Sequence, residues 1–126
     1  YNQFKKHGML KLFKGSHGYG NGEQRRDFVY VKDTIDVKMW FMNNNISGIF
    51  NVATGISRSF NDVANSVIKF FNSGYIEYID FPAGLEKQYQ AYTEADMTNL
   101  KNNGYPGKPT ELENGVESYL SFLDKS

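Results

Sequence analysis

Arg26-Asp27-Phe28-Val29-Tyr30-Val31-Lys32-Asp33 is the stretch that decides the fold, and it belongs with Gly48-Ile49-Phe50-Asn51-Val52-Ala53-Thr54-Gly55. Phe28 to Val31 and Ile49 to Ala53 are short runs of mostly apolar residues, which favour buried strands. Apolar residues over 35–42, spaced as in a helix, lie between them. The sequence therefore predicts a strand, a helix and a second strand that form a βαβ unit.

The rest of the chain carries turn and helix signals that complete one small α/β lobe. Ser59 followed by Asp62 predicts a capped helix with an apolar stripe, and Thr110 followed by Glu113 predicts a second one. Asp33 or Thr34 is expected to cap the helix over 35–42. The remaining predicted elements are a helix end over 3–7, strands over 10–13 and 77–80, and a helix over 95–102. We expect the strand over 10–13 to pair with the one over 28–31 as a hairpin.

Composition limits the class of protein. The 126 residues carry 14 basic and 14 acidic side chains, so they lack the clustered excess of Lys and Arg that general nucleic-acid binders use. No apolar run is long enough to span a membrane. The lack of cysteine excludes disulfides and thiolate chemistry and fits a cytoplasmic protein. We therefore expect a cytoplasmic domain with neither a nucleic-acid nor a membrane partner.

Two patterns resemble functional sites but lack essential parts. The glycine-rich loop over 15–24 matches neither the dinucleotide nor the Walker pattern, and it leads into a predicted strand rather than a helix. We interpret it as a surface loop, and the alternative is a mobile loop that covers a ligand. His7 and His17 have no further ligands at a spacing that suits a metal, so we expect no metal site.

Arginine and aromatic residues are better candidates for binding. A guanidinium beside a glycine loop is suited to bidentate contact with a diphosphate, which Arg26 would provide. The alternative is an ordinary ion pair of Arg26 with Asp27 or another carboxylate. Phe13, Tyr89 and Tyr92 would suit a platform for a sugar or a base, or they are partly buried core residues.

Four segments resemble the C-terminal part of the ADP-glyceromanno-heptose 6-epimerase family, which are nucleotide-sugar epimerases of the extended short-chain dehydrogenase/reductase type. They are Lys11-Leu12-Phe13-Lys14-Gly15-Ser16, Arg26 to Asp33, Ser47 to Gly55 and Tyr89 to Leu100. The second and third recur across nucleotide-sugar epimerases and dehydratases, whereas the first and fourth are more restrictive. The resemblance implies that residues 1–126 form an α/β substrate-binding lobe, and that an NADP-binding Rossmann domain precedes them in the intact enzyme.

The resemblance also implies roles for individual residues. The implied substrate-binding residues are Phe13, Lys14, Gly15, Ser16, Arg26 and Tyr89. Arg26 falls on the arginine that binds the nucleotide diphosphate, and the register of Arg-Asp-Phe favours it over its neighbour Arg25. The family often has Glu where Lys14 stands, so a backbone contact is the expected role at that position.

The implied reaction interconverts ADP-D-glycero-D-manno-heptose and ADP-L-glycero-D-manno-heptose by NADP-mediated oxidation and reduction at heptose C6, for lipopolysaccharide core synthesis. Tyr1 and Lys5 have the spacing of the family's catalytic pair but lie too close to Arg26 to be that pair. We therefore expect no catalytic residues here and no turnover by this chain alone. Intact relatives are implied to be homo-oligomers, pentamers by the family pattern. The alternatives are a UDP-sugar epimerase or dehydratase, and a non-catalytic module that binds nucleotide sugars.

Overall fold

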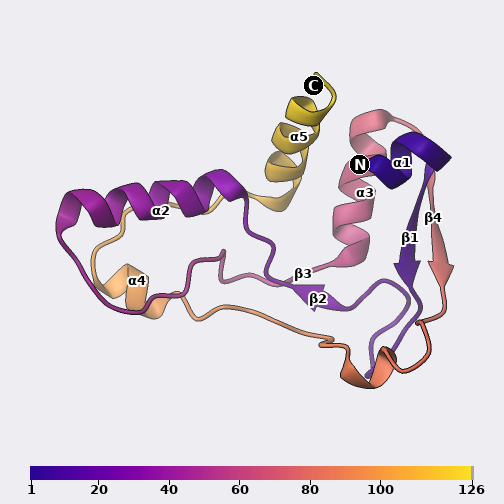
Figure 1. Ribbon diagram of the computed structural model, residues 1–126, viewed down its shortest axis with the longest axis horizontal. Helices are drawn as coiled ribbons and strands as arrows, with labels where there is room; N and C mark the ends of the chain where they lie inside the picture. The colour runs from indigo at the N-terminus through magenta and orange to yellow at the C-terminus, as the bar shows by residue number, and fades with distance from the viewer. Residues whose placement is uncertain (126) are drawn as a thin grey trace.

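The computed structural model describes residues 1–125 and confirms a mixed α/β fold. Two short sheets and five α-helices make up the described chain, with α2 and α4 at one end and α1, β1 and β4 at the other (Figure 1). The elements are α1 Asn2–His7, β1 Met9–Phe13, β2 Arg25–Arg26, α2 Val31–Asn44, β3 Arg58–Ser59, α3 Phe60–Phe71, β4 Tyr75–Ile79, the 3-10 helix η1 Glu86–Gln88, α4 Thr98–Asn102 and α5 Leu112–Leu123.

Strand pairing differs from the predicted hairpin. β1 pairs with β4 in parallel, from Met9 opposite Tyr75 to Phe13 opposite Ile79. β2 pairs with β3 in the antiparallel sense. The hairpin prediction is wrong because α3 lies between β1 and β4 in the sequence, and a crossover helix brings two strands together in parallel.

Both strands of the predicted βαβ unit over 28–53 are also wrong, because neither forms. Phe28 to Tyr30 has no regular structure, α2 begins at Val31, and Ile49 to Ala53 forms no strand. A parallel strand needs hydrogen-bonded neighbours, and the sheets of the described residues contain only β1 with β4 and β2 with β3. Without a neighbour, Ile49 is 95% exposed. The predicted burial is wrong as well, because every residue of 28–31 and 49–53 is half-buried or exposed.

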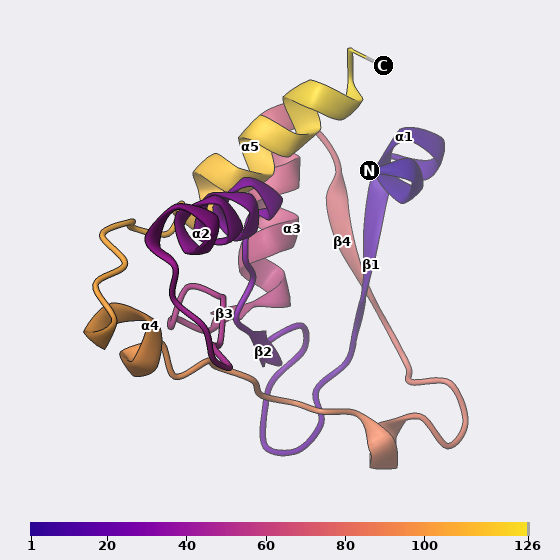
Figure 2. The same ribbon diagram turned by 60° about the vertical axis from the view of Figure 1, so that its left-hand side comes forward.

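The core forms where α3 packs between the β1–β4 pair and α5 (Figure 2). Ser59 and Asp62 form the predicted capping box at the start of α3. The buried core residues are Phe4, Leu10, Ala64, Val67 and Leu120. Burying an aliphatic or aromatic side chain of this size stabilises a fold by about 1.5–3 kcal/mol, so this cluster is the main source of stability at this end.

The two other predicted caps bind each other instead of capping helices. Thr110 donates from its backbone N–H and its hydroxyl to the carboxylate of Asp33, at 2.8 and 2.7 Å. α2 begins at Val31 and α5 at Leu112, so neither Asp33 nor Thr110 stands at an N-cap. The predicted second capping box is therefore wrong. Its Glu113 pairs with Arg58 instead and joins α5 to the start of α3.

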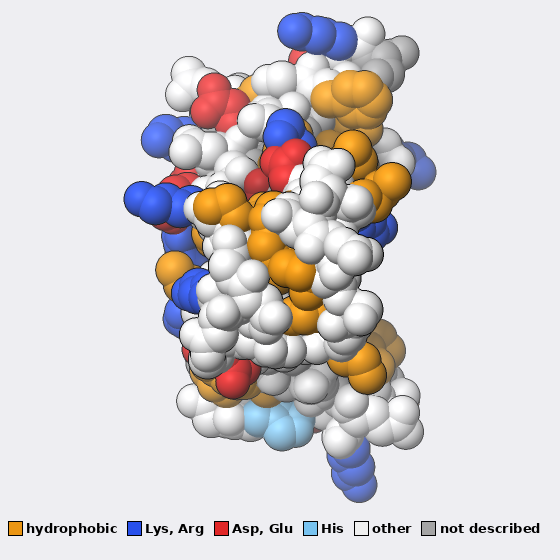
Figure 3. Space-filling view, turned by 90° about the vertical axis from the view of Figure 1, so that its left-hand side faces the viewer, with side chains coloured by type: hydrophobic (Ala, Val, Ile, Leu, Met, Phe, Trp, Pro, Cys, Tyr) orange, Lys and Arg blue, Asp and Glu red, His pale blue; other side chains and the backbone are white. Residues whose placement is uncertain are grey.

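The helix α2 is apolar on more than one side, as predicted. Val37 is 3% exposed, and Trp40 packs edge-on against Tyr105 at 5.4 Å between ring centres. A second stripe of the same helix is exposed and consists of Val31, Ile35, Met39 and Met42. Figure 3 shows apolar side chains gathered on this end of the molecule. Among residues 1–125, no helix combines the length and the apolar character needed to cross a membrane.

Candidate functional site

A cavity of about 240 Å³ lies beside the carboxyl ends of β1 and β4. In a parallel pair both strands end at the same edge, which is where ligands bind in open α/β sheets. The start of α3 and the turn after η1 close its other sides. Its lining residues are Gln3, Lys11, Leu12, Phe13, Gln24, Phe60, Ile79 and Tyr89.

Aromatic rings cluster beside this cavity. Phe13 stacks on Phe81 with ring centres 4.3 Å apart and meets Tyr89 edge-on at 5.8 Å. Phe81 and Tyr89 are themselves 5.0 Å apart. Two of the three predicted platform residues, Phe13 and Tyr89, therefore lie together, whereas Tyr92 is 46% exposed and is not part of this cluster. Phe81 is instead the third ring of the cluster. Its position just after a predicted strand was the signal that could have identified it.

Arg26 lies against the same cluster. Its guanidinium carbon is 5.2 Å from the ring centre of Tyr89 and 5.9 Å from that of Phe60. No carboxylate within residues 1–125 forms an ion pair with Arg26, so the alternative of a pair with Asp27 is not seen. One guanidinium nitrogen donates to the carbonyl of Arg25, at 2.9 Å. The remaining donors are available for an anion.

Arg25 has a different environment from its neighbour. Its Nε donates to the hydroxyl of Ser57 at 3.1 Å, and a second nitrogen donates to the Ser57 carbonyl. Its backbone N–H donates to the carbonyl of Ala91 and its C=O accepts from the N–H of Thr93, which fixes the segment that follows η1. The structure therefore gives Arg25 a role in holding the chain together and leaves Arg26 as the arginine beside the cavity.

Three of the predicted substrate residues do not line the cavity. Lys14 pairs with Asp80 at 2.9 Å on the surface. Gly15 packs so closely that an added Cβ would lie 2.4 Å from the carbonyl oxygen of Tyr19, so only glycine fits there. Ser16 is buried and accepts a hydrogen bond from Gln24. These residues shape the loop that follows Phe13.

Asp27 organises the backbone around the site, a role that sequence reasoning missed. Its carboxylate accepts from the backbone N–H of Thr54, Gly55 and Ala95, at 2.8, 2.8 and 3.1 Å, and from the Thr54 hydroxyl. Burial raises the pKa of Asp27, but these hydrogen bonds lower it further, so the pKa lies below its usual value. Asp27 thereby joins three segments at the residue after Arg26.

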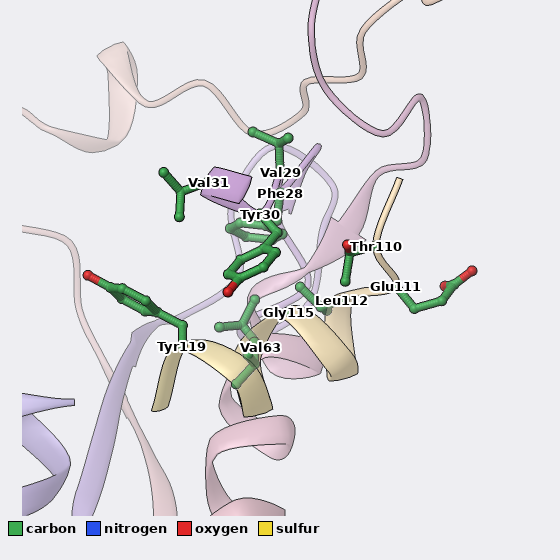
Figure 4. A pocket seen from close by; sticks show the side chains of 11 residues that line it. Phe28, Val29, Tyr30, Val31, Val63, Thr110, Glu111, Leu112, Gly115 and Tyr119 are labelled. Atoms are coloured by element: carbon green, nitrogen blue, oxygen red, sulfur yellow. The ribbon is translucent and has the colours of Figure 1, made fainter. Parts of the chain in front are cut away.

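A second cavity of about 370 Å³ lies between residues 28–31 and helices α3 and α5 (Figure 4). It is lined mainly by apolar side chains, among them Phe28, Val63 and Val116, with Glu111 as its one charged residue. Gly115 lets α5 approach Tyr30, whose Cβ would be 3.3 Å from a Cβ at that position. This cavity offers no cationic side chain for a phosphate, so we place the candidate nucleotide site at the smaller one.

Residues 1–125 do not fit a dinucleotide cofactor. The glycine-rich loop joins β1 to β2, a strand, and therefore presents no helix N-terminus to a phosphate. Tyr1 and Lys5 both contact Asp124, at 3.1 and 2.8 Å, which ties α1 to the end of α5. Within the same described residues, no three His, Asp or Glu side chains gather as a metal site.

Comparisons with known proteins find nucleotide-sugar epimerases similar in sequence to this chain. A family model described as the NAD dependent epimerase/dehydratase family matches residues 3–53. The ADP-L-glycero-D-manno-heptose-6-epimerase of Alkalilimnicola ehrlichii is 45% identical over 122 residues, which cover 96% of this chain and 38% of that protein. The chain therefore spans less than half of this curated relative.

Solved structures of epimerases share the fold of this chain. The ADP-L-glycero-D-manno-heptose-6-epimerase of Helicobacter pylori superposes with a TM-score of 0.77 and 26% identity, over 98% of this chain and 36% of that one. A Bacillus cereus UDP-glucuronic acid 4-epimerase, solved with its nucleotide-sugar ligand and NAD, has a TM-score of 0.75 at 20% identity, over 98% of this chain and 37% of that one, which shows a shared fold. Over nearly its whole length the chain is thus similar to the C-terminal portion of ADP-L-glycero-D-manno-heptose-6-epimerases, and residues 3–53 match the model of the NAD dependent epimerase/dehydratase family.

Proposed function

We propose that this chain is the substrate-binding portion of an ADP-heptose 6-epimerase, an isomerase that interconverts the two C6 epimers of ADP-glycero-manno-heptose. The observation that carries the proposal is the position of Arg26 against Tyr89 at the edge of an aromatic-lined cavity, in a chain 45% identical to such an epimerase. On this proposal a preceding domain of the intact enzyme binds NADP, and residues 1–126 bind the nucleotide sugar. The intact enzyme is proposed to be a cytoplasmic homo-oligomer.

The proposed binding of the nucleotide sugar follows from the chemistry of the site. A flat base suits the cavity because Phe13, Phe60 and Tyr89 present aromatic surfaces there. A diphosphate suits the unpaired donors of Arg26, which form charge-assisted hydrogen bonds to phosphate oxygens. Holding both ends of ADP fixes where the sugar extends, and such positioning is a large part of catalysis in enzymes that act on a bound cofactor.

The same proposal accounts for the exposed stripe of α2. Val31, Ile35, Met39 and Met42 leave one side of this helix open to solvent. Large exposed apolar patches on a protein commonly mark contact surfaces. We expect this side of α2 to pack against the NADP-binding domain in the intact enzyme, and we expect no epimerisation by the present chain alone.

The experiment that tests the proposal is calorimetric titration of the chain with ADP-heptose and with a UDP-hexose. ADP-heptose should bind about tenfold or more tightly than the UDP-sugar. Arg26→Met should weaken ADP-heptose binding roughly ten- to hundredfold, because a hydrogen bond to a charged group is worth about 1.5–3 kcal/mol. Lys108→Met is the matched control, since it removes one positive charge from an exposed position outside the cavity.

The alternatives make different predictions in the same titration. Tighter binding of the UDP-sugar would replace the heptose enzyme with another nucleotide-sugar epimerase or dehydratase. Unchanged affinity in Arg26→Met would remove the proposed diphosphate site. Epimerisation of ADP-heptose by the purified chain would contradict the proposal that the catalytic pair lies elsewhere.

A further inference from the structure

The strongest unused feature of the molecule is a buried glutamine in the wall of the candidate nucleotide cavity. Gln24 is 1% exposed and is one of the residues that line this cavity. Its side-chain nitrogen donates to the carbonyl of Lys14 at 2.8 Å and to the hydroxyl of Ser16 at 3.3 Å. Its backbone carbonyl accepts from the N–H of Phe60, so the residue is fixed at both ends.

These contacts determine which way the amide faces. The carbonyl of Lys14 only accepts hydrogen bonds, so the amide atom that meets it must be the nitrogen. Both hydrogens of that nitrogen have partners, and the amide oxygen Oε1 has no donor among residues 1–125. Among residues 1–125, Glu77 Oε2 is the one fully buried side-chain acceptor without a hydrogen-bond partner, so Oε1 of Gln24 keeps access to the space of the cavity that it lines. A ligand in that cavity can therefore supply the hydrogen bond that the protein does not.

The surroundings of Gln24 restrict the chemistry of that ligand. Phe13, Phe60 and Tyr89 line the same cavity, so the space suits a flat aromatic ring. Lys11 is the single cationic residue of the lining, and its Nζ forms an ion pair with Oε2 of Glu77 at 3.7 Å. A planar heterocycle with a neutral hydrogen-bond donor at its edge fits these groups best.

We propose that Oε1 of Gln24 accepts a hydrogen bond from the exocyclic 6-amino group of adenine, which makes Gln24 a specificity-determining residue. This inference rests on the proposed function, because it takes the diphosphate at Arg26 as the anchor that directs the base into the cavity. Among purine nucleotides, one with an amino group at position 6 donates to this oxygen, and one without it displaces water from the oxygen and supplies no hydrogen bond in return.

The test compares ADP with purine riboside 5′-diphosphate, which lacks only the 6-amino group, by calorimetric titration of the full chain. The wild-type chain should bind ADP about tenfold more tightly, the effect of one buried neutral hydrogen bond. In Gln24→Met, which has a similar volume and no amide oxygen, the preference should fall below about twofold. Gln90→Met is the control, because it makes the same exchange at an exposed position outside the cavity.

The outcomes separate this inference from the function on which it rests. Equal affinity of the wild-type chain for the two nucleotides would overturn the role of Gln24, while a loss of ADP binding in Arg26→Met would leave the proposed function standing. A preference that survives in Gln24→Met would also overturn it. Failure of both nucleotides to bind overturns both proposals. If Gln24→Met does not fold, as judged by circular dichroism, the wild-type chain is titrated with 2-aminopurine riboside 5′-diphosphate, which carries its amino group at position 2 instead of position 6. It should bind as weakly as purine riboside 5′-diphosphate, and affinity equal to that of ADP would overturn the inference.

Discussion

The guanidinium carbon of Arg26 lies 5.2 Å from the ring centre of Tyr89, so a residue of β2 and a residue that follows η1 meet at the edge of one cavity. Cation–π contact of this kind is worth about 0.5–1 kcal/mol at an exposed site and more when water is excluded. The ring therefore orients the guanidinium before any anion arrives. Tyr89 acts on a diphosphate through Arg26 as well as by direct contact.

Replacement of Tyr89 tests this relationship. Tyr89→Leu should weaken ADP binding about fivefold, because it removes the ring that orients Arg26, whereas Tyr89→Phe should keep most of the affinity. Titration calorimetry measures both, and Tyr92→Leu is the control because that side chain lies outside the ring cluster. Equal losses in Tyr89→Leu and Tyr92→Leu would argue against a specific contact.

Asp27 should contribute to stability in a pH-dependent way. Its folded-state pKa lies below the ordinary value of 3.8, so the stability it provides is present above that pH and is lost as the pH falls through the folded-state pKa. Asp27→Asn should lower the free energy of unfolding at neutral pH by about 1–3 kcal/mol, since an amide cannot accept all of these backbone donors.

Urea denaturation at several pH values measures the effect of Asp27→Asn. The difference between wild type and variant should shrink as the pH falls from about 4 through the folded-state pKa of Asp27, because the carboxylate is protonated first in the unfolded chain and then in the folded one. Asp80→Asn is the control, as Asp80 is largely exposed and should change stability by no more than about 0.5 kcal/mol. A difference independent of pH would show that the charge of Asp27 is not what matters.

The helix cap at Ser59 gives a separate test of local stability. The Ser59 hydroxyl accepts from the backbone N–H of Asp62 at 3.1 Å, and the Asp62 carboxylate accepts from the N–H of Ser59 at 3.0 Å. Ser59→Ala should reduce the free energy of unfolding by about 1 kcal/mol. Ser66→Ala, within the same helix, should have a smaller effect, and thermal or urea unfolding compares the two.

Local signals predicted the elements whose causes are local. The capping box at Ser59 and the left-handed Gly8 that ends α1 both arise from neighbours within a few residues. The amphipathic stripe of α3 likewise predicted the side that packs on the core. Such features were therefore correct from sequence alone.

Features that depend on distant partners were not predictable in this way. Thr110 has the sequence of a helix cap, but Asp33 lies close enough in space to take its donors. Ile49 to Ala53 has the composition of a buried strand, but no described strand lies beside it. The same holds for the cavity: residue type and the resemblance both pointed to Phe13, Arg26 and Tyr89, whereas Gln24 and Phe81 were identified only from the three-dimensional structure.

The exposed stripe of α2 leads to a prediction about the isolated chain. Ile35 and Met39 are each 50% exposed and Met42 is 77% exposed, at positions that recur on one side of a helix. Water-exposed apolar surface of this kind favours association, so the chain should form oligomers or bind an apolar dye at micromolar concentration. The double variant Ile35→Lys with Met39→Lys should lower both, as measured by analytical ultracentrifugation and dye fluorescence. Asn43→Lys with Asn65→Lys adds the same charge at exposed polar positions and should change neither; an equal reduction there would assign the effect to net charge rather than to the stripe.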